Sequence, residues 1–223
     1  MRFVMQPDNL EAADFGDLVR RGYESPDVDY KAPASWRRMS GADKAELVRD
    51  VMGMANASRP GWIIYGISEG SGGQWVRNGV DEQSARSFDP SAIGNKIRRY
   101  CDPEASFAVH RQEVDGRLYV AIRVAPFQSV PHICRKSHGD VLSEGAVYVR
   151  TAASETSKVQ DAGQMRALLD RGIQIHADLI VHRLEELHFR VYGTPQPPAQ
   201  SPPDSRSFFE NEIAEARMRA GAP

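Results

Sequence analysis

The chain has 223 residues, the length of one domain or of one domain with an appendage. Its 41% hydrophobic and 26% charged residues are ordinary for a soluble globular protein and exclude a disordered tail or a collagen-like chain. With 28 Lys and Arg against 30 Asp and Glu, the net charge is −2, so charge alone does not favour nucleic acid as a partner.

The targeting and redox signals are few. Two cysteines, Cys101 and Cys134, cannot form a disulfide framework. The N-terminus does not read as a signal peptide, and no apolar run approaches the roughly 20 residues needed to span a bilayer. We therefore expect a cytoplasmic protein without a membrane contact.

Helical and strand patterns alternate along the body of the chain. Asp115-Gly116 is a strong hairpin signal between two apolar strands, and Ser40 is placed to cap a helix. The pattern predicts an α/β (α+β) domain with a mixed sheet and packed helices. The expected helices are 10–21, 42–56, 90–100 and one from about 159; the expected strands are 28–31, 62–68, the two flanking Asp115-Gly116, and 146–150.

From about residue 173 onward, the sequence predicts a helix, a linker and a tail helix. A 4-3-4-3-4 seam predicts a helix over about 173–191 that packs on the domain core or on a second copy of the chain. The domain then covers 1–193, a proline-rich linker covers 194–206, and an amphipathic tail helix covers 207–223. The tail helix, strongest over 207–219, is either a frayed end or a docking element for a partner protein or a second copy. The seam residues are Ile173, Ala177, Ile180, Leu184, Leu187 and Val191.

Three acids and a lysine form the first candidate site. In a strand over 28–31, Asp29 and Lys31 share the polar face, Glu24 lies in the preceding turn, and Glu69 closes the next apolar strand. If the two strands are neighbours, the three carboxylates converge at one sheet edge, where Mg²⁺ or Mn²⁺ would offset their repulsion and could activate water. The competing interpretation is three solvated surface acids.

The order of these pieces resembles the Schlafen-type, Alba-like (AlbA_2) domain over about residues 20–170. In this chain the pieces are Glu24-Ser25, Asp29-Tyr30-Lys31, Ala55-Asn56, the strand 61–67, Gly79-Val80, Pro131, Tyr148-Val149-Arg150 and Thr156. The resemblance implies a nucleic-acid-binding fold. In animal Schlafens an acidic triad on this framework implies a metal-dependent endoribonuclease acting on tRNA and rRNA.

Carried onto this chain, the triad is Glu24, Asp29 and Glu69. Asp29 stands where the family usually has Glu, and Glu69 where it usually has Asp, so each carboxylate is displaced by one methylene. The two changes are opposite in length and could compensate across one metal ion. Many prokaryotic relatives are described only as DNA-binding domains or regulators, so the resemblance does not by itself imply cleavage.

The remaining candidates are basic. Arg135, Lys136 and His138 form a loop that we expect to contact phosphate, whereas a zinc site at His132, Cys134 and His138 is disfavoured because it lacks partner cysteines. Arg150 is expected to bind substrate or to anchor the fold. The cations at 20–21 and 96–99 are either phosphate contacts or solvated helix faces.

Two main hypotheses follow. The first is a metal-dependent endoribonuclease that cuts structured RNA such as tRNA, with Lys31 stabilising the developing phosphate charge, in antiphage defence or a toxin-like system. The alternative is a DNA- or RNA-binding regulatory domain, or a binding subunit of a larger defence assembly. A homodimer through the 173–191 seam would pair two lobes around a nucleic acid.

Overall fold

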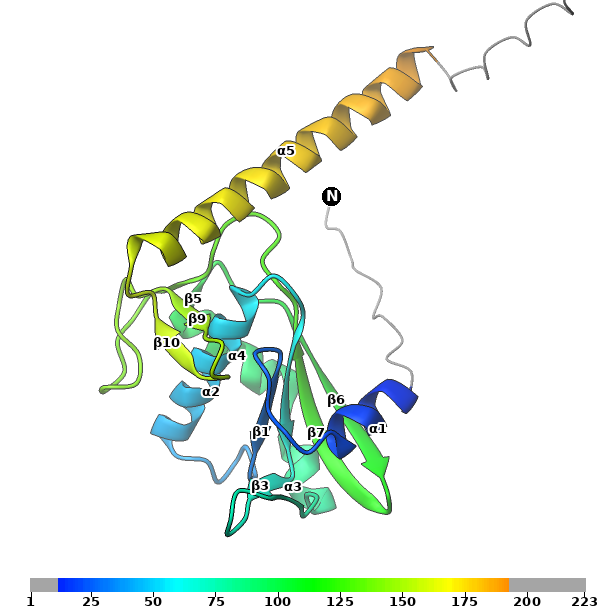
Figure 1. The fold of residues 1–223 in the computed structure, drawn as a ribbon, viewed down its shortest axis with the longest axis vertical. Helices are drawn as coiled ribbons and strands as arrows, with labels where there is room; N and C mark the ends of the chain where they lie inside the picture. Colours follow the sequence, from blue (N-terminus) through cyan, green and yellow to red (C-terminus); the bar gives the residue numbers. More distant parts are fainter. Residues whose placement is uncertain (1–11, 193–223) are drawn as a thin grey trace, which may run out of the picture. The chain divides into compact units, whose positions relative to one another are not determined.

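The computed structural model describes residues 12–192, and a four-stranded sheet forms its centre (Figure 1). The strand order is β1-β2-β7-β6, with β1 parallel to β2 and the remaining pairs antiparallel. The predicted mixed sheet is therefore confirmed. The bounds are β1 Val28–Lys31, β2 Gly61–Tyr65, β7 Arg117–Val124 and β6 Phe107–Val114.

The β6–β7 hairpin closes where the sequence predicts it. Val114 pairs with Arg117, so Asp115 and Gly116 are the two residues of the loop. Both have positive φ, 50° and 74°, the backbone that a type I′ turn needs and that Asp-Gly adopts readily.

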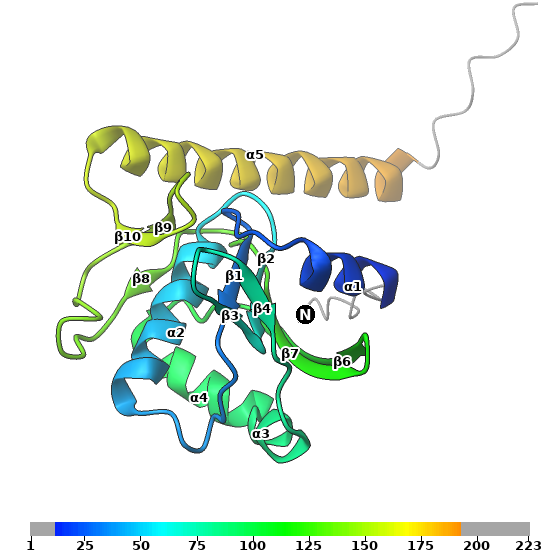
Figure 2. The same ribbon diagram turned by 60° about the horizontal axis from the view of Figure 1, so that its bottom comes forward.

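Helices cover both faces of the sheet (Figure 2). The helices α2, Gly41–Ala55, and α4, Pro90–Tyr100, pack on one face and form the larger core with Ile63, Val120 and Ile122. The helix α1, Ala12–Arg20, packs on the other face against Val28, Tyr30 and Ile64. Alternate residues of β1 and β2 thus enter opposite cores, as the two-residue period of a strand requires. A short helix α3, Glu82–Ser87, precedes α4.

The helix α2 begins at the predicted cap. The Ser40 hydroxyl accepts a hydrogen bond from the backbone N–H of Asp43, and the Asp43 carboxylate accepts one from the backbone N–H of Ser40. This reciprocal capping box fixes where the helix starts, and therefore which of its side chains face the sheet.

The predicted strand 62–68 is two strands. Gly66 has a φ of +113°, which bends the chain out of the main sheet after β2. The strand β3, Ile67–Glu69, then pairs with β4, Trp75–Arg77, in a separate hairpin. The apolar run predicts extended backbone correctly, but it does not distinguish a strand from two strands joined by a bend.

Two further strand pairs lie outside the main sheet. The strand β5, Cys101–Asp102, pairs with β8, Ile133–Cys134, and β9, Tyr148–Arg150, pairs with β10, Thr156–Lys158. The β9–β10 pair packs against α2. It thereby brings the Tyr148-Val149-Arg150 motif next to β1.

One helix, α5, runs from Ala162 to Tyr192 and replaces the two helices expected from about 159 and over 173–191. The compact unit that carries the sheet ends at Ile175, where Leu168 packs with Phe127 and Val147; a second unit begins at His176. The large side chains of the predicted seam are exposed, Ile173 and Val191 at 68% each. The predicted linker 194–206 and tail helix 207–223 lie outside the described residues.

Within residues 12–192, no helix is both long and apolar enough to cross a membrane.

Candidate functional site

The alternation of β1 sets the orientation of the candidate acids. Val28 and Tyr30 enter the core beneath α1, so Asp29 and Lys31 lie together on the opposite face, as the sequence predicts. That face is covered by α2 and is not a solvated edge, because Asp29 is only 5% exposed. A carboxylate held this far from water needs partners close by.

The first partner is Lys31, which joins Asp29 to an acid that the sequence analysis missed. The Lys31 Nζ lies 2.9 Å from Asp29 Oδ2 and 2.9 Å from Asp50 Oδ2. Asp50 belongs to the buried face of α2, and its side chain is 3% exposed. The sequence does contain a sign of this buried acid. Asp50 falls at the helical spacing of the apolar residues Leu47, Val51 and Met54, where a solvated Asp is not expected.

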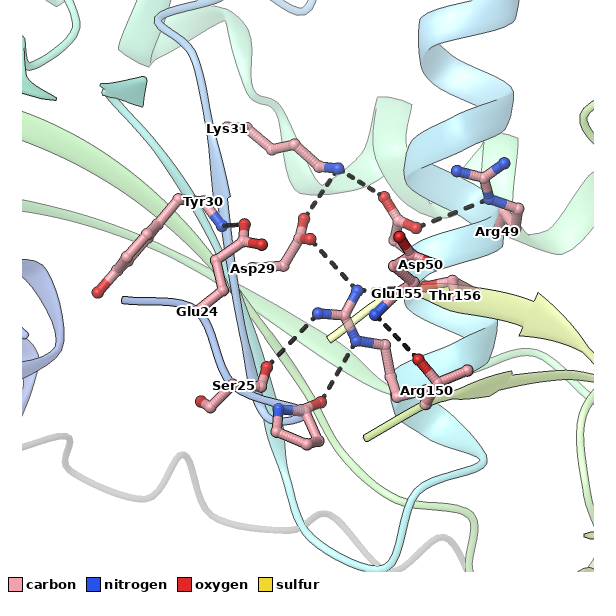
Figure 3. Close-up of polar contacts among 12 residues, drawn as sticks. Glu24, Ser25, Asp29, Tyr30, Lys31, Arg49, Asp50, Arg150, Glu155 and Thr156 are labelled. Carbon is pink, nitrogen blue, oxygen red and sulfur yellow. Dashed lines mark hydrogen bonds and ion pairs between the residues drawn. The ribbon is translucent and has the colours of Figure 1, made fainter. Parts of the chain in front are cut away.

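The second partner of Asp29 is Arg150 from β9, whose side chain is 2% exposed (Figure 3). Its Nη1 donates to Asp29 Oδ1 at 3.2 Å and to Thr156 Oγ1 at 3.3 Å. Its Nε and Nη2 donate to the backbone oxygens of Pro26, at 3.3 Å, and Ser25, at 3.5 Å. Of the two roles that the sequence left open, these contacts match anchoring, because one guanidinium joins the turn before β1 to the β9–β10 pair.

The electrostatics of this cluster follow from its burial. Burial raises the pKa of Asp29, the nearby Asp50 carboxylate raises it further, and the cations Lys31 and Arg150 act in the opposite direction. For Lys31, burial would lower the pKa, but the carboxylates of Asp50 and Asp29 outweigh it and the pKa is raised. The lysine is therefore held charged between two acids.

Glu24 lies beside this cluster and is half-buried. Its Oε1 accepts a hydrogen bond of 2.8 Å from the backbone N–H of Tyr30, which ties the turn to β1. Burial raises the pKa of Glu24, and the negative charge of Asp29 raises it further. The hydrogen bond from the Tyr30 N–H acts in the opposite direction. Glu24 and Asp29 thus form a pair of neighbouring acids, as the sequence predicts.

Glu69 does not complete a triad with them. It is exposed at the end of β3, beyond the bend at Gly66. In the part of the chain from 12 to 192, no three His, Cys, Asp or Glu side chains are grouped so that they could hold a metal ion. Both Asp29 oxygens already face cations, so the expected ligand set of Glu24, Asp29 and Glu69 does not fit a divalent cation in this arrangement.

The predicted basic loop is on the surface. Arg135 and Lys136 are exposed, and the half-buried His138 ring meets Tyr100, with Nδ1 3.2 Å from the tyrosine oxygen. His132 is instead buried, and its Nδ1 donates to the backbone oxygen of Pro103 at 2.7 Å. The two histidines therefore have different partners.

Comparisons with known proteins add a family and two structural similarities. A sequence model of the family described as Schlafen, AlbA_2 matches residues 24–158, which contain Glu24, Asp29, Lys31 and Arg150. A search of curated proteins finds no match.

Two solved structures resemble the fold distantly. The DIP2311 protein from Corynebacterium diphtheriae is 18% identical with a TM-score of 0.45, over 69% of this chain and 27% of that one. The N-terminal domain of a RecG-related protein from Nitrosomonas europaea is 15% identical with a TM-score of 0.39, over 68% of this chain and 95% of that one. The chain thus corresponds to about a quarter of the length of the first protein.

Proposed function

Because this chain belongs to the Schlafen AlbA_2 family, we propose that it is a nucleic-acid-binding domain whose buried charges position a binding surface. The observation that carries the choice of binding over cleavage is the closed contact set of Asp29. Its two oxygens meet Lys31 and Arg150, so the central acid of the expected triad serves the fold. The exposed Arg135 and Lys136 supply charge of the sign that a phosphate backbone attracts.

The charge balance of the cluster supports this choice. The three acids Glu24, Asp29 and Asp50 are matched by three cations, Lys31, Arg150 and Arg49, the last with its Nε 3.8 Å from Asp50 Oδ1, so the cluster needs no added cation for neutrality. A metal ion at Asp29 would have to displace Lys31 or the buried Arg150, and the displaced cation would leave its contacts unmade. Lys31, with both neighbours acidic, is equally committed and is not free to face a phosphate.

A metal-dependent endoribonuclease acting on structured RNA such as tRNA is the second candidate. The observation that favours it is the Glu24–Asp29 pair, in which burial raises the pKa of Glu24 and the neighbouring Asp29 carboxylate raises it further. Such a pair favours a bound cation, Mg²⁺ or Mn²⁺, when the competing cations can move aside. A role in defence, as a regulator or as a subunit of an assembly, is compatible with either activity.

One set of reactions separates the candidates. The purified protein is incubated with total tRNA and with single- and double-stranded DNA, in Mg²⁺, in Mn²⁺ and in EDTA, and each mixture is run on native and denaturing gels. We expect a shift on the native gel in all three conditions and intact strands on the denaturing gel.

The variants Glu24→Gln and Asp29→Asn test the alternative. RNA fragments that require the metal and disappear in Glu24→Gln would support the endoribonuclease and refute binding alone. Glu24→Gln is the more informative variant, because Gln can still accept the Tyr30 N–H and should keep the fold. Neither a shift nor fragments on any nucleic acid would contradict both candidates.

A further inference from the structure

A cluster of cations lies on the surface between α2 and α4, outside the acidic site. It consists of Lys44 from α2 with Lys96 and Arg99 from α4, and is called here the α2–α4 basic cluster. Within residues 12–192, none of the three forms an ion pair with a carboxylate. The pKa of Lys96 is lowered, first by partial burial and then by the positive charges of Arg99 and Lys44. The three cations therefore repel one another, and in the described part of the chain none of them is paired with a carboxylate that would offset the repulsion.

Two aromatic rings hold these cations in place. The Lys44 Nζ lies 5.1 Å from the centre of the Trp36 ring, and the Lys96 Nζ lies 5.1 Å from the centre of the Tyr100 ring. The Arg99 guanidinium carbon lies 5.7 Å from the same Tyr100 ring. Cations over ring faces are attracted by the ring quadrupole, which offsets part of their repulsion and restricts where they point.

Tyr100 also joins the cluster to the loop that the sequence singles out. Its ring packs edge-on against His138 at 5.7 Å, and its backbone oxygen accepts a 2.8 Å hydrogen bond from the N–H of Arg135. The backbone of the exposed Arg135 therefore lies next to the end of α4 that carries Lys96 and Arg99. The α2–α4 basic cluster and the 135–138 loop are parts of one basic surface.

We propose that this surface binds the phosphodiester backbone of a nucleic acid, an inference that rests on the proposed function and locates it. A polyanion would relieve the repulsion among cations that lack counterions and would release its own condensed ions. The residues Trp36 and Tyr100 are only 7% and 3% exposed, so their rings support the cations and are too buried to stack on bases. The surface thus reads backbone charge and not base sequence.

A charge-matched comparison tests this inference. The test variant carries Lys44→Gln, Lys96→Gln and Arg99→Gln. The control variant carries Arg20→Gln, Arg86→Gln and Arg98→Gln, which remove the same charge from arginines paired with Asp115, Glu82 and Glu104. Fluorescence anisotropy with labelled oligo(U), oligo(dT) and a DNA duplex is measured from about 50 to 200 mM salt. Thermal unfolding confirms that both variants are folded.

The test variant should bind more weakly than wild type, by more than about tenfold at low salt, on all three probes alike. Its plot of log affinity against log salt should be shallower by about two to three, since each lost phosphate contact removes roughly 0.7–0.9 from the slope. The control should stay close to wild type in slope.

The outcomes distinguish the two levels of proposal. A wild-type protein that binds none of the probes contradicts nucleic-acid binding itself. If the wild-type protein binds and the two variants lose affinity equally, the assignment to this surface is overturned and nucleic-acid binding is not. The same holds if the wild-type protein binds and neither variant loses affinity. Binding of the same proteins to phosphatidylserine vesicles is measured in parallel. If the test variant keeps its affinity for nucleic acid but loses binding to the vesicles, the cluster is a lipid site and the inference is overturned.

Discussion

At the residue scale, the charges around Asp29 act as one unit. Asp29 is buried beneath α2, Asp50 belongs to the buried face of that helix, and the Lys31 Nζ lies 2.9 Å from an oxygen of each. Arg150 completes the set from β9, with a side chain that is 2% exposed. Removing the charges of Asp29, Asp50 and Arg150 from water is costly, and the mutual attraction within the set offsets that cost only while every member has its partner. The network is therefore sensitive to the loss of any single group.

Arg150→Met should lower the free energy of unfolding by about 3–5 kcal/mol, because it leaves Asp29 with one cation and frees the backbone oxygens of Ser25 and Pro26. Urea denaturation at pH 7 measures the loss. Arg98→Met is the matched control: its pair with Glu104 is exposed and screened by water, so the loss should be much smaller than for Arg150→Met. Equal, small losses in both variants would show that the buried network is not coupled in this way.

At the element scale, the bend at Gly66 separates the acids that the sequence places together. The register pairs Asp29 with Ile63 and Lys31 with Tyr65, so the chain leaves the main sheet one residue after its last pair with β1. From there β3 continues in a hairpin with β4, and Glu69 ends on the surface of that hairpin. The bend at Gly66 thus takes β3, with Glu69 at its end, out of the main sheet.

Gly66→Ala tests this dependence. The added Cβ would lie 2.8 Å from Tyr119 Cδ1 and 3.1 Å from the Cα of Gly79, at a φ of +113° that side chains rarely adopt. We expect a loss of at least about 3 kcal/mol in thermal or urea unfolding. Gly73→Ala, at a φ of +77° with nothing within 4 Å, should lose only about 1 kcal/mol. If the two losses were similar, the bend would not be a constraint on the fold.

At the scale of the whole molecule, α5 presents apolar surface that the described chain leaves uncovered. Its seam residues recur at spacings of four and three, and Leu184 and Leu187 are 59% and 56% exposed. Exposed apolar surface of this regularity is typical of a helix that packs against another helix. A second copy of the chain offers an identical seam, as an isologous interface requires.

We therefore expect a homodimer that Leu184→Glu dissociates, because the substitution places a charge in the middle of the seam. Light scattering coupled to size exclusion, at tens of micromolar protein, reports the change as a halving of the mass. Leu179→Glu is the control, since Leu179 is an exposed leucine of the same helix outside the seam. A wild-type mass of one chain would refute the dimer, and dissociation by Leu179→Glu alone would place the interface elsewhere.

The sequence by itself determined the features that depend on neighbouring residues. The capping box at Ser40, the Asp115-Gly116 turn and the pairing of Asp29 with Lys31 follow from local geometry, and the ordered motifs indicate the family. A period of two specifies which side chains share a strand face. It does not specify what covers that face.

The tertiary structure decided everything that depends on what covers a face. It brought Asp50 and Arg150 to Asp29 from α2 and β9, where sequence separation hides the contact. It moved Glu69 away through the angle at Gly66, and it assembled Lys44, Lys96 and Arg99 from two helices. Contacts between distant segments depend on how whole elements pack. Charged residues that the sequence alone would assign to a solvated face are therefore, in the structure, either buried in an ion-pair network or part of a basic surface.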